Sequence, residues 1–253
     1  MLKKRIIPLM LLRAGRLVKT IRFEKYRDVG DPVKSSAVYN SQASDEIILL
    51  NIEKSGDRVG QITQILPQIS KVCFMPLTVG GGVSTLTEAS LLLTQGADKV
   101  VINSAAYRNE DLITQVAERF GVQAVVVGID IKRGSSGKIS LWSCCGERLE
   151  KVTLEEHMRI CEKQGAGEFL IQSIDQDGMM AGYDLDLLTT ATNTSKVPII
   201  GCGGSGNYSH LKQAFTRTGV SALACGSLFN FSDSNPLRAK AFLNNEGLPC
   251  KVV

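Results

Sequence analysis

Eight short apolar runs recur along the chain, separated by longer amphipathic stretches, and this alternation limits the possible folds more than any other feature. The runs are RIIPLML, EIILLNI, PLTVGGG, KVVINSA, AVVVGIDI, EFLIQSI, PIIGCGG and ALACGSL. Near-continuous apolar runs are typical of parallel strands buried on both faces, and the stretches between them, such as DLITQVAERF, have helical periodicity. Eight such units in 253 residues predict an α/β fold, a closed (β/α)8 barrel that forms one domain over residues 1–253.

The eight runs also form two sets of four. EIILLNIE, which starts at Glu46, resembles EFLIQSID at Glu168, and PLTVGGG at Pro76 resembles PIIGCGG at Pro198, both at an offset of 122 residues. This repeat predicts that the barrel consists of two half-barrels. In such barrels the chemistry lies at the C-terminal ends of the strands, and the N-terminal ends serve stability.

Composition narrows the chemistry. Hydrophobic residues make up 43% of the chain and charged residues 21%, a globular composition. The seven cysteines lack metal-ligand spacing, and this favours buried thiols in a reducing cytoplasm. With two histidines, neither a histidine metal site nor a histidine-based triad is expected, so no metal and no cofactor are predicted and acid–base chemistry falls to carboxylates or lysines.

Charge and hydropathy limit the partners. The net charge of +4 is mild and dispersed, so it suits a small anionic substrate and does not indicate nucleic acid. No run of about 18 apolar residues predicts a membrane span. Pro8 interrupts the first apolar run, and therefore we interpret the N-terminus as a strand rather than a signal peptide.

Small residues cluster where four of the predicted strands end. These clusters are GGG at residues 80–82, NSA at 103–105, GCGGSG at 201–206 and GS at 226–227. Glycine lets a backbone approach an anion closely, and small residues before a helix leave N–H groups free for phosphate oxygens. The third and fourth runs predict one phosphate cradle and the seventh and eighth predict its repeat, which indicates a ligand with a phosphate at each end.

The order of motifs resembles a known family. KRIIP, GDP, LTVGGG, GADKVVINSAA, GID, GAGEFLIQSIDQDG, GYDLDL, GCGGSGN and GSLF are similar, over nearly the whole chain, to the cyclase subunit of imidazole glycerol phosphate synthase, a lyase. In that family a glutaminase subunit docks on the N-terminal face and releases ammonia into the barrel axis. At the other face ammonia attacks a doubly phosphorylated ribulosyl nucleotide, and aspartates on the first and fifth strands act as general acid and base.

The resemblance implies roles for individual residues. Lys19 matches the lysine of a mobile loop after the first strand, which closes over substrate; its alternative is an exposed loop lysine. Four charges at strand starts match a ring that gates ammonia entry: Arg5, Glu46, Lys99 and Glu168. The phosphate contacts that it implies are Gly82, Asn103 and Ser104 on one side and Asp177, Gly178, Gly203, Gly204, Gly226 and Ser227 on the other.

The first catalytic aspartate is missing. Asp130 matches the fifth-strand aspartate, but Leu11 stands where the first-strand aspartate is expected. Loss of a positioned acid or base typically costs about 10² to 10⁴ in rate. Further departures from the family, all expected near the C-terminal mouth, are Leu9, Met10, Asn51, Val101, Gln172 and Cys202.

This pattern resembles the paralogues found in bacterial surface-polysaccharide clusters. There the barrel and its glutaminase supply ammonia to a separate amidotransferase that makes an acetamidino sugar, and this is the function we predict. Two alternatives stay open. One is an active cyclase of histidine biosynthesis, which forms imidazole glycerol phosphate with Asp130 and a substitute such as Lys19 or a water. The other is a non-catalytic scaffold that activates the glutaminase.

Overall fold

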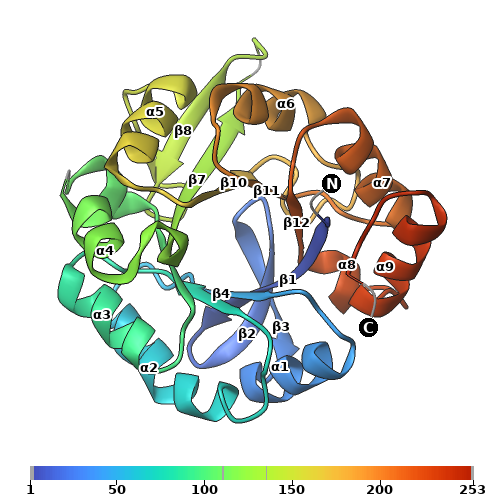
Figure 1. Cartoon of the computed structure of the whole chain (residues 1–253), viewed down its shortest axis with the longest axis horizontal. Coiled ribbons are helices and arrows are strands. Elements are labelled where there is room, and N and C mark those ends of the chain that lie inside the picture. The colour runs from blue at the N-terminus through green and yellow to red at the C-terminus, as the bar shows by residue number, and fades with distance from the viewer. Residues whose placement is uncertain (1–2, 110, 135, 252–253) are drawn as a thin grey trace.

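The chain forms a closed barrel of parallel strands surrounded by helices, seen end-on in Figure 1. The computed structural model describes residues 3–109, 111–134 and 136–251. Within these residues the barrel strands are β1 (Arg5–Arg13), β4 (Ile47–Asn51), β5 (Leu77–Gly80), β6 (Lys99–Ile102), β7 (Val125–Arg133), β10 (Glu168–Ser173), β11 (Ile199–Cys202) and β12 (Ala222–Cys225). Pairing of β10 with β7 and of β1 with β12 joins the two halves, so the predicted barrel is confirmed.

The remaining elements cover the barrel. The helices are α1 (Pro32–Ser41), α2 (Arg58–Ile69), α3 (Leu86–Thr94), α4 (Leu112–Phe120), α5 (Leu154–Gln164), α6 (Leu185–Thr194), α7 (Tyr208–Arg217), α8 (Ser227–Asn230) and α9 (Pro236–Asn245), with the 3-10 helices η1 (Ser104–Tyr107) and η2 (Val122–Ala124). Several helices begin with a side-chain cap: Thr85, for example, accepts from the Glu88 backbone N–H, and Glu88 accepts in return.

Apolar residues form two cores on the two sides of the strands. One core lies between the strands and the helices, and the other fills the barrel, where Ile7, Ile48, Val126 and Ile200 are fully buried. Because successive side chains of a strand point to opposite faces, the strands need apolar residues at nearly every position. This explains why the sequence showed continuous apolar runs rather than alternation.

The register of the strands shows the half-barrel repeat directly. Leu11 on β1 pairs with Leu50 on β4, and Asp130 on β7 pairs with Gln172 on β10. Residues 50 and 172 are related by the repeat offset of 122. Leu11 and Asp130 therefore hold equivalent positions in the two halves.

Each half also carries an antiparallel hairpin that the sequence did not predict. In the first half β2 (Arg16–Ile21) and β3 (Glu24–Gly30) extend from β1, and in the second half β8 (Ile139–Ser143) and β9 (Arg148–Leu149) extend from β7. Val18 of β2 pairs with Leu11, and Trp142 of β8 pairs with Asp130. The hairpins thus stand at equivalent places, both at the C-terminal mouth.

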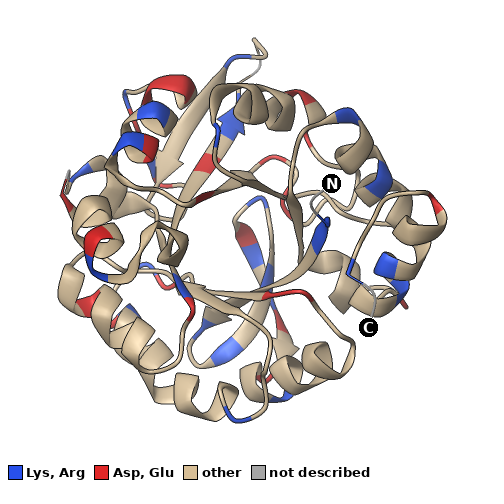
Figure 2. Ribbon diagram, in the orientation of Figure 1, with Lys and Arg blue, Asp and Glu red and all other residues tan. Residues whose placement is uncertain are grey.

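Charged residues are spread over the outer helices. Figure 2 shows Lys and Arg interspersed with Asp and Glu along them. Among the residues that the structure describes, no helix is both long enough and apolar enough to cross a membrane.

Candidate functional site

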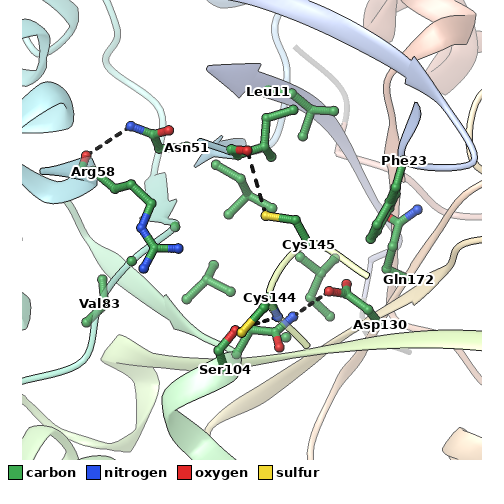
Figure 3. Close-up of a pocket in the computed structure, with 18 of the residues that line it drawn as sticks. Leu11, Phe23, Asn51, Arg58, Val83, Ser104, Asp130, Cys144, Cys145 and Gln172 are labelled. Atoms are coloured by element: carbon green, nitrogen blue, oxygen red, sulfur yellow. Dashed lines mark hydrogen bonds between the residues drawn. The ribbon is translucent and has the colours of Figure 1, made fainter. Parts of the chain in front are cut away.

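A cavity of about 340 Å³ opens at the C-terminal mouth of the barrel. Its walls include predicted residues from both halves, among them Leu11, Gly82, Asn103, Ser104 and Asp130. Figure 3 shows Leu11 and Asp130 at different sides of this cavity. The structure therefore brings the first predicted cradle and the predicted proton-transfer position into one site.

The first cradle depends on two glycines with positive φ. Gly81 has φ +97° and Gly82 has φ +94°, values that favour glycine. A Cβ on Gly82 would lie 2.8 Å from the Cβ and the Nε of Arg58, whose side chain packs over the turn. On the other side of the cradle, the Ser104 hydroxyl accepts from the Cys144 backbone N–H at 2.9 Å.

Asp130 is the titratable group at the centre of the mouth. Asn103 Nδ2 donates to its carboxylate at 2.9 Å. Burial raises the pKa of Asp130 to about 7, although the Asn103 hydrogen bond acts in the opposite direction, and the charge of Asp177 raises it further. A carboxyl with this pKa can both give and take a proton near neutral pH.

The equivalent position of the first half is apolar. Leu11 is 8% exposed and packs inside the barrel with Leu9, Val18 and Leu50. Of the other predicted departures, Asn51, Val101 and Gln172 line the same cavity, and Cys202 lines the second cradle. Met10 lies next to Leu11 on β1, but its side chain belongs to the core between strands and helices, because alternate residues of β1 point outward.

The second cradle is far smaller. Lys19 and the predicted contacts Asp177, Gly178, Gly203, Gly204, Gly226 and Ser227 line it, yet its volume is about 20 Å³. This is room for about one water molecule, which needs some 10–15 Å³ by this kind of measure. Gly203 and Gly204, with φ +96° and +108°, repeat the backbone of Gly81 and Gly82, so the difference comes from a side chain.

That side chain is Lys19, which lies on strand β2 rather than in an irregular loop. It is 5% exposed, and its ammonium group donates to the carbonyl of Leu9. Burial lowers the pKa of Lys19 to about 8, while Asp177 raises it. The alternative of an exposed loop lysine is wrong, because the β2–β3 hairpin folds inward over the mouth.

Asp177 fastens this hairpin. Its carboxylate accepts from Thr20 Oγ1 at 2.6 Å and from the Phe23 backbone N–H at 3.1 Å. Burial raises the pKa of Asp177, and these two hydrogen bonds and Lys19 lower it. In this arrangement the Asp177 side chain binds the protein itself, and its role toward phosphate stays a prediction.

Several residues of the large cavity were not predicted: Phe23, Arg58, Arg108, Cys144 and Cys145. Arg58 could have been found, because it opens α2 directly after the loop that follows β4, at the reactive end of the barrel. Phe23 and the two cysteines lie in the hairpins, and nothing in the sequence indicated that these fold over the mouth. No group of three or more His, Cys, Asp or Glu within the described residues is arranged to hold a metal ion.

At the other end of the barrel the four predicted charges form a closed ring. Glu46 accepts from Arg5 at 2.9 Å and from Lys99 at 3.0 Å, and Glu168 pairs with Arg5 and, at 3.0 Å, with Lys99. Thr78 Oγ1 also donates to Glu46 at 2.5 Å. Each cation bridges both carboxylates, which offsets the cost of removing four charges from water. That the ring admits ammonia stays a prediction.

Comparison with known families identifies a family that the chain matches. The model of a family described as "Histidine biosynthesis protein" matches residues 5–234, nearly the whole chain. The matched region includes the charged ring, Asp130, Leu11 and both cradles.

Proposed function

The chain belongs to the histidine biosynthesis protein family, and we propose that it is the barrel subunit of a glutamine amidotransferase that delivers ammonia for the amidination of a surface sugar. Members of this family are typically isomerases or cyclases of the histidine pathway. One observation supports a function different from those of these enzymes: Leu11 occupies the register position that Asp130 holds in the other half, while the charged ring is complete. The proposed setting is the cytoplasm, with a glutaminase docked on the N-terminal face and a separate amidotransferase that uses the ammonia.

The ring and the layer above it suit the passage of ammonia as a neutral molecule. Arg5 and Lys99 are each paired with Glu46 and Glu168, so the ring carries no net charge, and the fully buried Ile7, Ile48 and Val126 follow along the axis. Moving an unpaired ion into such an apolar layer costs several kcal/mol or more, whereas a small neutral amine pays much less. The proposed path therefore starts at the ring and ends in the cavity beside Asp130.

At the mouth the side chains support one proton transfer rather than two. Asp130, with a pKa of about 7, can take a proton from the nitrogen of a reacting amine or return one. Leu11 can do neither. A cyclisation that needs an acid and a base on opposite sides lacks one of them here, which supports delivery of ammonia to another acceptor.

The direct test is glutaminase activation. The barrel is combined in turn with each glutaminase encoded in its own genome, and glutamine hydrolysis is measured. We expect the native barrel to activate one partner. With ¹⁵N-amide glutamine, labelled ammonia should reach an acceptor at the C-terminal mouth only when the complex is intact. The variant Lys99→Met, which opens the ring, is expected to uncouple hydrolysis from delivery. Absence of activation with every partner would refute the proposal.

A histidine-pathway cyclase is the second candidate. Lys19 favours it, since its pKa of about 8 and its place at the mouth qualify it as a substitute acid. The test is turnover of the formimino-ribulosyl aminoimidazole carboxamide ribonucleotide with excess ammonium salt, for the native protein and Leu11→Asp. Free ammonia removes the need for a glutaminase. Turnover only after the substitution supports the amidotransferase subunit, and native turnover at family rates supports the cyclase.

The scaffold alternative makes a different prediction. If the barrel only activates the glutaminase, Asp130→Asn leaves both hydrolysis and the yield of sugar product unchanged in the complete system. If ammonia is delivered beside Asp130, the substitution lowers product formation and leaves glutamine hydrolysis intact.

A further inference from the structure

The two glycine cradles are repeats of one another, but only the first has room for an anion. Their backbones match closely, with φ values of +97° and +94° at Gly81 and Gly82 against +96° and +108° at Gly203 and Gly204. The first opens into a cavity of about 340 Å³ and the second encloses about 20 Å³. The difference must therefore come from the side chains that reach each cradle.

The hairpins supply this difference. Lys19 and Ser143 follow the hairpin residues that pair with Leu11 and Asp130, so they are equivalent in the repeat. Lys19 reaches into the second cradle, where a Cβ on Gly226 would collide with its ammonium group. Ser143 is too short to fill the first, and its hydroxyl instead accepts from Arg108 at 3.0 Å and donates to Glu150.

The first cradle has a cation available for a ligand. Arg108 lines the cavity, but Glu150 at 3.2 Å already pairs with it. The Arg58 guanidinium makes no hydrogen bond or ion pair with the residues that the structure describes, and Figure 3 shows it pointing into the cavity. Its Nε lies over Gly82, next to the backbone that forms the cradle. A planar guanidinium at such a place suits the oxygens of a phosphate.

We infer that this chain binds a ligand with a single phosphate, held in the first cradle by the Gly81–Gly82 turn, Ser104 and Arg58, while Lys19 occupies the second cradle as a built-in cation. This inference rests on the proposed function in that it concerns the same mouth beside Asp130, and it replaces the sequence-based expectation of a ligand with a phosphate at each end. The other end of the ligand lies against Leu11 and Leu50, where the cavity wall is apolar.

The test is a titration of the ¹⁵N-labelled full chain with inorganic phosphate, followed through backbone amide signals. The amides of Gly82 and Ser104 report on the first cradle, and those of Gly204 and Gly226 report on the second. In the native protein we expect phosphate to shift the first pair only. Arg58→Ala is expected to weaken this binding at least tenfold, because a charge-assisted hydrogen-bond donor is lost. Arg217→Ala, at the exposed end of α7, is the matched control and should bind as the native protein does.

Two variants of Lys19 distinguish a side chain that fills the second cradle from one that binds phosphate there. Lys19→Ser copies the first half and is expected to bring the Gly204 and Gly226 amides into the titration. Lys19→Met keeps the size of the side chain without its charge, so phosphate should not shift the amide signals of Gly204 and Gly226. Phosphate shifts at both cradles of the native protein, lost in both variants, would overturn the inference and make Lys19 a phosphate ligand. Shifts at neither cradle would overturn it as well. Ammonia delivery is measured separately with glutamine, so its failure would be seen independently of phosphate binding.

Discussion

The first half of the barrel ends its leading strand on Leu11 and leaves its glycine cradle open, whereas the second half ends on Asp130 and has its cradle filled by Lys19. The strands, the glycine turns and the hairpins correspond between the halves. The chemistry therefore differs through a few side chains on a repeated backbone. Four experiments, in order of decreasing expected effect, test how far this comparison holds.

In the charged ring each half contributes one carboxylate, Glu46 or Glu168, while both cations, Arg5 and Lys99, come from the first half. We expect Glu46→Gln to lower the free energy of unfolding by about 3 kcal/mol, since it leaves two partly buried cations with one carboxylate. Glu168→Gln should cost less, because Glu46 is the more buried and also accepts from Thr78. Urea unfolding measures both. The control Glu147→Gln, in the exposed pair with Lys54, should cost less than about 1 kcal/mol; equal losses in all three would contradict the buried ring.

The glycine turns of the two cradles should differ in how much an added methyl group destabilises the fold. Gly204→Ala should cost about 3 kcal/mol, since its Cβ would collide with the backbone carbonyl of Gly182. Gly82→Ala meets the Cβ and Nε of Arg58 at 2.8 Å rather than a backbone carbonyl at 1.9 Å, so we expect a smaller loss, about 2 kcal/mol from the strain of positive φ and a small shift of Arg58. Thermal unfolding of the two variants measures the difference. A larger loss for Gly82→Ala than for Gly204→Ala would contradict the ranking of these two contacts.

Asp130 should make stability depend on pH. Burial raises the pKa of Asp130 to about 7 from a usual value of 3.8, so the folded state keeps a proton that the unfolded state releases. Stability is therefore lost as pH rises from about 4 to 7. Asp130→Asn removes this loss, and we expect the variant to exceed the native protein by about 2 kcal/mol above pH 7 and by less at pH 5.

Leu11→Asn is the control for Asp130→Asn, since it places the same neutral amide at the equivalent position of the first half. It should shift stability by the same amount at every pH. Urea midpoints between pH 5 and pH 8 measure both variants. A gap between Asp130→Asn and the native protein that does not change with pH would show that Asp130 is ionised in the fold.

The smallest effect is expected at the β2–β3 hairpin. Thr20→Val removes the hydrogen bond to Asp177 and keeps the size of the side chain, at a cost of about 1 kcal/mol. Amide hydrogen exchange in β2 and β3 should become about fivefold faster. The pKa of Asp177 should also rise, because this bond lowers it. Thr216→Val, on the exposed face of α7, is the control; equal exchange in both variants would mean that Asp177 does not fasten the hairpin.

The sequence predicted the barrel and its repeat well, because burial of the strands leaves a pattern of apolar residues in the sequence. Strands buried on both faces read as continuous apolar runs, and the duplication repeats at a fixed offset. The ring could be anticipated for a related reason: Arg5, Glu46, Lys99 and Glu168 each stand at the head of such a run, where a charge needs a partner. The equivalence of Leu11 and Asp130 also follows from the motifs.

The hairpins left no comparable signal. β3 is largely exposed, and the turn before it contains Arg22 and Phe23 with positive φ, which propensity does not indicate for these residue types. The sequence therefore placed Lys19 in a loop, although the fold buries it. The same holds for Cys144 and Cys145 above the first cradle.

By itself the sequence determined the barrel and its two halves, because both depend on the order of residues along single strands, and its resemblance to a known family implied the ring and the position of the missing aspartate. Only the tertiary structure decided that Lys19 fills one cradle and that Arg58 stays unpaired beside the other. The physical reason is that the occupancy of a cradle depends on the direction and length of side chains from distant segments. Burial and pairing of those charges are settled when the hairpins fold over the mouth.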